Sequence, residues 1–278
     1  MIDGKLSLVL PAHNEEPNIR HVLAEATHVL PRFVTDYEIL VVNDGSQDNT
    51  GRIARDIAAE DTRIRVVDHL ENRGYGAALR TGFTNSTGDW VMVMDSDRQF
   101  NIGDLVYLAP LASEYDLVAG YRIQRNDPFH RTLFGKTFRL AMRILFGVQL
   151  YDIDCAFKLI RGDILRALNL ESSGAMVSTE LMARWARSGA TWTQVGVHHY
   201  PRTAGEQSGG SLKVILEAMR DVPVLWWRMN RESSQEIRDE SVQSGSTTGL
   251  TPGQAALILV GVFASVGAVA LRLIRRHD

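Results

Sequence analysis

The chain has 278 residues, of which 45% are hydrophobic and 23% are charged, and its formal net charge is -3. This length and composition predict a folded protein with a substantial core, and the slightly acidic charge gives no reason to expect nucleic acid as a partner. A single cysteine, Cys155, excludes an internal disulfide and fits a reducing compartment.

The first 120 residues alternate short apolar runs with helical patterns. The first run, Leu6–Leu10, is interrupted by Pro11 before it reaches the length of a signal-peptide core, so it is predicted to be a strand. The other predicted strands are Tyr37–Val42, Ile64–Asp68, Trp90–Met94 and Tyr115–Ala119, and helices are predicted after Glu15, Asp48, Gly76 and Asn101. This order is typical of an α/β fold with a mainly parallel sheet and helices on both faces.

Polar clusters follow three of these predicted strands, at residues 11–16, 43–46 and 95–99. In a parallel sheet, ligands bind beyond the carboxyl ends of the strands. In the third cluster, Asp95 and Asp97 are two positions apart, so both carboxylates can project to the same side and share one hard divalent cation. The sequence therefore predicts a site in which a metal ion holds a diphosphate.

Two further segments have both a structural and a functional interpretation. Asp44 is a turn or cap residue in the simpler interpretation, whereas in a binding site its carboxylate would accept the ring N–H of uracil or guanine. Residues 72–80 place glycines where a loop enters a helix. Close packing explains them, but the helix N-terminus, with Arg80 over it, would also suit an anionic ligand.

Residues 127–147 form a basic amphipathic pattern that includes Arg131 and Arg139. Its cations suit either a solvated helix face or the phosphate layer of a membrane. A second amphipathic stretch, residues 212–229, ends in two tryptophans and an arginine, as at a headgroup boundary.

The C-terminal region is predicted to be a tethered membrane anchor. Residues 230–253 have the polar composition of a flexible linker, and residues 254–274 contain an uncharged run, Ala255–Leu271, long enough for one transmembrane helix. With no signal-peptide pattern, residues 1–230 are expected in the cytoplasm, which would put three C-terminal arginines outside, against the positive-inside tendency.

Four motifs, in this order and spacing, resemble those of the inverting family 2 glycosyltransferases of GT-A fold: Pro11–Glu15, Asn43–Ser46, Asn72–Leu79 and Asp95–Gln99. Within that family they are most similar to the dolichyl- and polyprenyl-phosphate sugar synthases, over about residues 5–228. The resemblance implies a Rossmann-like GT-A domain over residues 1–211. It implies inverting transfer of a hexose from a UDP- or GDP-linked sugar, with Mg²⁺ or Mn²⁺, to a polyprenyl phosphate at the cytoplasmic membrane face. It leaves the oligomeric state open, a homo-oligomer included.

The resemblance also implies a role for individual residues. Those assigned to the nucleotide are Pro11, His13, Glu15, Val42, Asp44, Asp95 and Ser96. Asp95 and Asp97 would hold the metal, and Gln99 would face the sugar or the acceptor. Arg122 and Arg202 match phosphate-binding arginines, and the acceptor phosphate is further assigned to Arg131, Arg139 and Ser208.

Several positions depart from the family pattern. Asn43 stands where an aspartate is usual, His13 replaces a common tyrosine, and Ala156 replaces a glycine in the segment from Asp152 to Lys158. Ser208 aligns with a lysine of eukaryotic members, which weakens the case for GDP-mannose as the donor.

Three other functions stay open. A lipid or saccharide hydroxyl acceptor would need a general base, for which Glu180 is the candidate, although a helix N-terminal acid is the simpler interpretation of that residue. A nucleotidyltransferase usually has a glycine-rich loop after its first strand, and residues 11–16 contain no glycine. A membrane-tethered binding module without activity is the last alternative.

Overall fold

The computed structural model describes residues 1–123, 129–174, 176–202 and 221–231, with the backbone alone for residues 129–137. The chain divides into two compact units, which we describe separately. The first comprises residues 1–125 and 150–208, and the second comprises residues 126–149 and 209–278.

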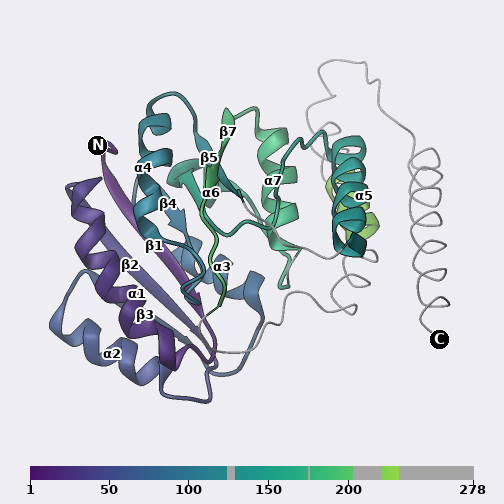
Figure 1. The fold of residues 1–278 in the computed structure, drawn as a ribbon. Helices are drawn as coiled ribbons and strands as arrows, with labels where there is room; N and C mark the ends of the chain where they lie inside the picture. Colours follow the sequence, from purple (N-terminus) through teal and green to yellow (C-terminus); the bar gives the residue numbers. More distant parts are fainter. Residues whose placement is uncertain (124–128, 175, 203–220, 232–278) are drawn as a thin grey trace, which may run out of the picture. The chain divides into compact units, whose positions relative to one another are not determined.

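The first unit is built on a seven-stranded sheet in the order β3-β2-β1-β4-β6-β5-β7 (Figure 1). Its strands are β1 (Lys5–Ala12), β2 (Asp36–Asp44), β3 (Ile64–His69), β4 (Trp90–Val93), β5 (Leu117–Arg122), β6 (Lys158–Arg161) and β7 (Trp192–Val197). Strand β6 is antiparallel to β4 and β5, and all other neighbours pair in parallel. The mainly parallel sheet predicted from the sequence is therefore confirmed.

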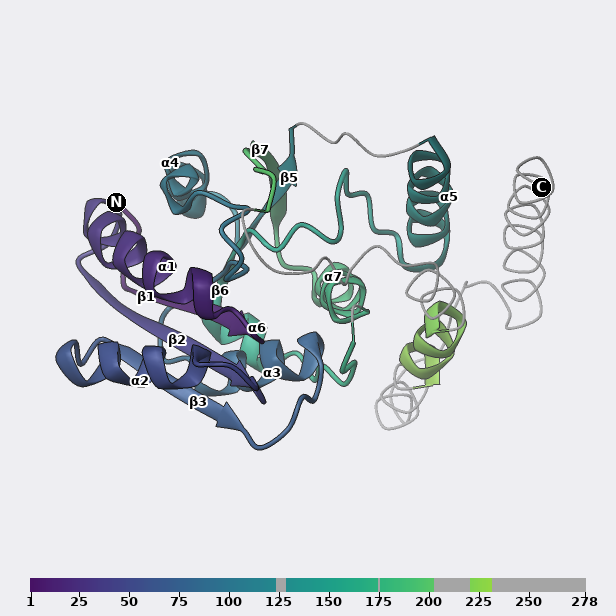
Figure 2. The same cartoon turned by 60° about the horizontal axis from the view of Figure 1, so that its bottom comes forward.

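Helices follow the strands as the βα pattern predicts. They are α1 (Glu16–Val29), α2 (Thr50–Glu60), α3 (Tyr75–Asn85), α4 (Leu105–Leu108), α6 (Gly162–Ala167) and α7 (Val177–Ser188), with short 3-10 turns at Leu30–Arg32, Ile102–Asp104 and Ala109–Ser113. Helix α3 lies beside α6 and α7 (Figure 2). Helices α1 to α4 begin within a few positions of Glu15, Asp48, Gly76 and Asn101, after which helices were predicted.

Helices cover both faces of the sheet, because successive side chains of a strand point to opposite sides. Leu8 and Leu10 of β1 join a core that contains Ile19 of α1. Between those two leucines, Val9 faces α3, where a Cβ added to Gly82 would lie 2.3 Å from the Val9 side chain. The absence of a side chain at Gly82 lets α3 approach the sheet closely.

The direction of the strands determines where the site forms. Strands β1, β2, β4, β5 and β7 all run the same way, so their carboxyl ends meet at one edge of the sheet. The polar clusters that follow β1, β2 and β4 therefore lie at this edge, together with Arg122 at the end of β5.

The second unit contains helix α5 (Phe129–Phe146), which confirms a helix where the basic amphipathic pattern predicts one. Among its described side chains, Ala141 and Met142 are buried, whereas Leu140 and Ile144 are exposed. Residues 221–231 are also helical, and the guanidinium of Arg231 lies 4.6 Å from the ring centroid of the exposed Trp227.

No helix among the described residues is both long and apolar enough to cross a membrane. The predicted transmembrane segment, residues 254–274, lies outside those residues, as does most of the predicted linker.

A buried carboxylate connects β1, β2 and β3 at the end of the sheet opposite the polar clusters. Glu38 of β2 accepts hydrogen bonds from the Ser7 hydroxyl (2.7 Å), from the Thr87 amide (2.7 Å) and from Arg65 (2.9 Å). Burial acts to raise the pKa of Glu38, but these hydrogen bonds outweigh it and hold the pKa below its ordinary value. The charged form therefore stabilises the folded protein.

We expect Glu38→Gln to lower the free energy of unfolding at pH 7 by about 1–3 kcal/mol. The new side-chain NH₂ group would face hydrogen-bond donors where the parent has a carboxylate oxygen. A lowered folded-state pKa contributes stability above the unfolded value of about 4.3, and this is lost as the pH falls through the folded value. The difference between variant and parent should shrink between pH 5 and about pH 3 in urea unfolding. Glu60→Gln, at the exposed end of α2, is the control, and a difference that grew on acidification would contradict the assignment.

Candidate active site

The loops after β1, β2 and β4 are tied to one another by short hydrogen bonds. The His13 ring nitrogen Nδ1 lies 2.7 Å from the carbonyl oxygen of Asp44, and the Ser96 hydroxyl donates to the carbonyl of Pro11 at 2.8 Å. The amide of Asn14, whose φ of 57° is left-handed, donates to the Ser46 hydroxyl at 3.0 Å. The structure thus brings together four of the residues that the sequence assigns to a nucleotide pocket.

Asp95 and Asp97 form an incompletely satisfied acid pair at this edge. The Asp97 carboxylate is almost buried and accepts a hydrogen bond from the Gln99 amide at 3.0 Å. Asp95 Oδ1 is buried with no hydrogen-bond partner among the described residues. Burial, and then the charge of Asp97, raise the pKa of Asp95 to about 7. A buried oxygen without a partner is costly, so this pair fits a cation.

The donor set also indicates which kind of cation would fit. No group of three or more His, Cys, Asp or Glu side chains in the described ranges is arranged to enclose a metal ion. Two carboxylates alone suit Mg²⁺ or Mn²⁺, which complete their coordination with water and with phosphate oxygens of a ligand.

Arg202 contributes a positive charge to this acid pair. Its Nη2 lies 2.7 Å from Asp97 Oδ2 and 3.7 Å from Glu15 Oε1. Burial raises the pKa of Glu15, whose other oxygen accepts a hydrogen bond from Asn18 at 2.7 Å. Three residues predicted for the site therefore meet, although the sequence predicted phosphate, and not carboxylate, as the partner of Arg202.

Gln99 is fastened to the segment that carries Arg202. Its side-chain amide donates to the Tyr200 carbonyl at 3.0 Å, and the Tyr200 amide donates to the Gln99 carbonyl at 2.8 Å. Gln99 thus lies beside the acid pair and has a partner that the sequence did not indicate. Its contact with the sugar or the acceptor stays a prediction.

Asp44 has the contacts expected of a turn residue. Its Oδ1 accepts from the Arg73 amide (2.9 Å) and lies 2.6 Å from Nδ1 of His69, and its Oδ2 accepts from the Gly74 amide (2.9 Å). The carboxylate therefore shapes the loop between β3 and α3. A contact between Asp44 and a nucleotide base stays a prediction.

Asn43 shows why the usual aspartate is absent at its position. Its side-chain amide donates to Asp68 at 2.7 Å, and Asp68 also pairs with Arg55. An aspartate at position 43 would face a like charge. Val42, also predicted for the pocket, is fully buried, and its side chain lies near Gly82 on the α3 face of the sheet.

The start of α3 is not available to an anion in this structure, so that interpretation of residues 72–80 is wrong. The amides of Gly76 and Ala77 both donate to the Ser173 carbonyl, at 2.7 and 3.2 Å, and Arg80 donates to the Leu170 carbonyl at 3.3 Å. The segment before α7 occupies the position expected for the ligand.

Glu180 secures that segment and is fully buried. Its Oε2 accepts from the amides of Glu171 (3.0 Å) and Ser172 (2.7 Å), and Arg184 donates to its Oε1 at 3.0 Å. Burial acts to raise the pKa of Glu180, but the hydrogen bonds outweigh it and lower the pKa below its ordinary value. A carboxylate whose charged form is stabilised by hydrogen bonds in this way is poorly suited to remove a proton from an acceptor.

Arg122 forms a two-pronged ion pair with Asp152, through Nε at 2.6 Å and Nη2 at 2.8 Å. Burial acts to lower the pKa of Arg122, yet this pair raises it further above its ordinary value. The pair fixes the plane of a guanidinium that has five N–H donors in all. Asp152 was noted in the sequence as part of a motif but not as a site residue.

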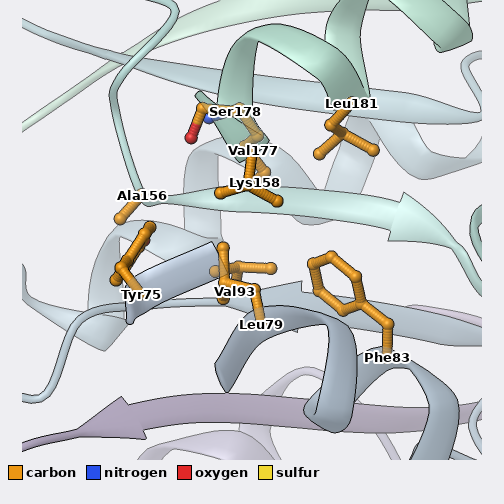
Figure 3. Close-up of a pocket in the computed structure, with 9 residues that line it drawn as sticks. All are labelled: Tyr75, Leu79, Phe83, Val93, Ala156, Lys158, Val177, Ser178 and Leu181. Atoms are coloured by element: carbon orange, nitrogen blue, oxygen red, sulfur yellow. The ribbon is translucent and has the colours of Figure 1, made fainter. Parts of the chain in front are cut away.

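Lys158 shapes the segment that follows Asp152. It is almost fully buried, and its ammonium donates to the carbonyl of Ile153 at 3.0 Å and to that of Cys155. Burial lowers the pKa of Lys158. It lines a cavity between α3, β4, β6 and α7 (Figure 3), whose volume of ≈ 10 Å³ admits about one water molecule. Tyr75 and Ser178 are the polar residues beside it.

The structure does not bring three of the residues predicted for the acceptor phosphate together with the acid pair. Ser208 and the side chain of Arg131 lie outside the described residues, and Arg139 lies in the second unit, half-buried on α5.

Comparison with known proteins gives matches over most of the chain. A sequence model of Glycosyl transferase family 2 matches residues 7–168. Undecaprenyl-phosphate 4-deoxy-4-formamido-L-arabinose transferase from Pseudomonas fluorescens (strain SBW25) is 32% identical over 213 residues, 76% of this chain and 61% of that protein. The enzyme of that name from Enterobacter sp. (strain 638) is 29% identical over 217 residues, 76% and 64% of the two proteins. The chain thus spans less than two thirds of these relatives' length.

Solved structures share the fold. Glucosyl-3-phosphoglycerate synthase from Mycobacterium tuberculosis, in complex with Mn²⁺ and uridine-diphosphate-glucose, superposes with a TM-score of 0.56, at 25% identity and 73% coverage of both chains. Mannosyl-3-phosphoglycerate synthase from Rubrobacter xylanophilus superposes with a TM-score of 0.57 at 19% identity, over 90% of this chain and 79% of that one.

We expect Asp44→Asn to loosen the loop between β3 and α3, because the new amide group cannot accept from both Arg73 and Gly74. Leaving one of these amides without its acceptor costs about 1–3 kcal/mol locally. Hydrogen exchange followed by mass spectrometry should show faster exchange over residues 70–76. Asp68→Asn, at a more exposed carboxylate, is the matched control, and equal protection in parent and Asp44 variant would refute the assigned role.

Proposed function

The chain belongs to Glycosyl transferase family 2, and we propose that it transfers a sugar from a nucleotide-sugar donor to the phosphate of a polyprenyl phosphate. The observation that carries the proposal is the acid pair of Asp95 and Asp97, which has an unsatisfied buried oxygen at the carboxyl edge of the sheet. A solved relative holds Mn²⁺ and uridine-diphosphate-glucose. Two relatives are named as undecaprenyl-phosphate transferases, which supports the lipid acceptor.

On the donor side, Asp95 and Asp97 would hold Mg²⁺ or Mn²⁺. When bound, such an ion neutralises charge on a leaving nucleoside diphosphate. The Gln99 amide orients Asp97, and Ser96 holds the end of β4 to the end of β1. The nucleoside would bind against the loops that contain His13 and Asp44.

On the acceptor side, the chemistry does not require a protein base. A phosphate monoester has its second pKa near about 6, so at neutral pH it is largely the nucleophilic dianion. The buried and fully bonded Glu180 gives no support to a hydroxyl acceptor. Arg122, oriented by Asp152, would hold the acceptor phosphate opposite the leaving group. Attack from that side inverts the anomeric configuration without a covalent sugar intermediate.

Two kinds of sugar are candidates for the transferred group. The sequence motifs favour a UDP- or GDP-linked hexose, whereas the relatives' names point to a 4-deoxy-4-formamido-L-arabinose unit. We propose the hexose as the first choice and test both. Helix α5 and residues 221–231, with the exposed Trp227, would rest on the cytoplasmic surface of the membrane beside the predicted anchor.

Incubation of the full chain in vesicles with labelled UDP-glucose, GDP-mannose or a nucleotide-linked formamidoarabinose tests the donor and the acceptor together. Each donor is offered undecaprenyl phosphate, 3-phosphoglycerate or no acceptor, with Mn²⁺ or with EDTA. We expect an organic-extractable labelled lipid only with undecaprenyl phosphate and Mn²⁺. Transfer to 3-phosphoglycerate instead would overturn the lipid acceptor, and transfer in EDTA would overturn the metal requirement.

Asp97→Ala should lower the rate of transfer by about 100-fold or more while the melting temperature stays within a few degrees, since its loss removes charge stabilisation of the leaving group. Asp56→Ala, in an exposed ion pair on α2, should keep full activity. Full activity in the Asp97 variant would show that the cation is held elsewhere.

A further inference from the structure

Alternate residues of the segment 198–202, here called the arm, bind the chain between β4 and α4. Asp104, which is almost buried, accepts from the His198 amide at 2.6 Å and lies 3.1 Å from the His198 ring nitrogen. Tyr200 and Gln99 exchange two hydrogen bonds, at 2.8 and 3.0 Å. Arg202, the next residue in this alternation, reaches Asp97.

The arm and the acid pair are therefore parts of one hydrogen-bonded unit. Gln99 donates its amide to Asp97 Oδ1 while its side chain holds Tyr200. Asp97 Oδ2, the other oxygen, takes the Arg202 guanidinium at 2.7 Å. Both oxygens of this carboxylate are thus engaged by the loop and the arm that it binds.

The contact with Arg202 conflicts with a bound divalent cation. Mg²⁺ coordinates oxygen at about 2.0–2.1 Å, and a guanidinium held at 2.7 Å from the same oxygen would repel it. The Arg202 side chain is about three-quarters buried, so this repulsion would be weakly screened by solvent.

We propose that Arg202 is a built-in counter-ion of Asp97, that Gln99 and Asp104 position it there, and that the divalent cation must displace it. This inference rests on the proposed function, in which Asp97 binds the cation. Before the cation binds, Arg202 offsets the negative charge of the acid pair. When the cation takes its place on Asp97, the guanidinium is released next to the diphosphate. Binding of the cation and movement of the arm are then coupled.

The test measures Mn²⁺ binding to the full chain by calorimetry, without nucleotide or acceptor. Arg202→Met removes the competitor and should tighten Mn²⁺ binding by about fivefold or more, at the lower end of ordinary couplings between sites. The Mn²⁺ affinity of Arg202→Lys should lie between those of Arg202→Met and the parent. Arg52→Met, which removes an exposed arginine paired with Asp56, is the control and should change nothing. Unchanged or weaker binding in Arg202→Met would overturn the exchange.

Asp97→Ala separates this inference from the proposed function. If that variant loses Mn²⁺ binding while Arg202→Met binds as the parent does, the cation site is correct and the exchange is wrong. If Asp97→Ala binds Mn²⁺ as the parent does, the cation site itself is wrong.

The positioning role of Gln99 has its own readout. Gln99→Met frees the arm and should tighten Mn²⁺ binding less than Arg202→Met does. In the double variant the effect of Gln99→Met should disappear, because there is no longer a guanidinium to position. Additive effects in the double variant would show that Gln99 acts on Asp97 directly and would overturn its role in positioning the arm.

Discussion

The site depends on the compensation of carboxylates that the fold collects at one edge of a parallel sheet. Strands β1 and β4 run the same way and are neighbours, so Glu15 and the pair Asp95 and Asp97 come close together. Burial makes each charge more costly, and mutual repulsion adds to that cost. Among the described residues, Arg202 pairs with Asp97 and Glu15, and the charges of Lys158 and Arg202 both act to lower the pKa of Asp95, yet Asp95 Oδ1 has no hydrogen-bond partner. A divalent cation at Asp95 would satisfy this oxygen and offset the excess negative charge.

Two other buried acids, Asp44 and Glu180, have hydrogen-bond donors of their own and a structural role. Asp44 and Glu180 are buried, yet each is surrounded by backbone amides and one nitrogen-bearing side chain. Hydrogen bonds to the charged form stabilise it without a metal ion. These two carboxylates hold the loops before α3 and α7, and those loops meet where Gly76 donates to Ser173. Burial of a carboxylate alone therefore does not mark a binding site, whereas Asp95 Oδ1, buried without a hydrogen-bond partner among the described residues, marks the position that we propose for a cation.

Much of the first half of the fold was predictable, because most of its strands are apolar runs bounded by polar residues. Strand β6 was missed because it has four residues and begins with a buried lysine, Lys158, that donates to carbonyls. Strand β7 was missed because its sequence includes Thr193, Gln194 and Gly196 and only Val197 is fully buried. The site acids were predictable from their positions after strands, but the arm from His198 to Arg202 was not, since its partners lie about a hundred residues earlier in the chain.

The same long-range contacts bear on the choice of acceptor. A hydroxyl nucleophile needs a base whose pKa lies near neutrality. The hydrogen bonds of Glu180, the acid predicted for that role, lower its pKa instead. Asp95, whose pKa is raised to about 7, is the acid that we propose for the cation. A phosphate nucleophile needs only oriented cations, and Arg122 is such a group, because Asp152 fixes its plane at the end of β5. Arg122 lies on the same edge of the sheet as Asp97. The arrangement of fixed charge, and not the presence of a base, is therefore the feature that favours a phosphate acceptor.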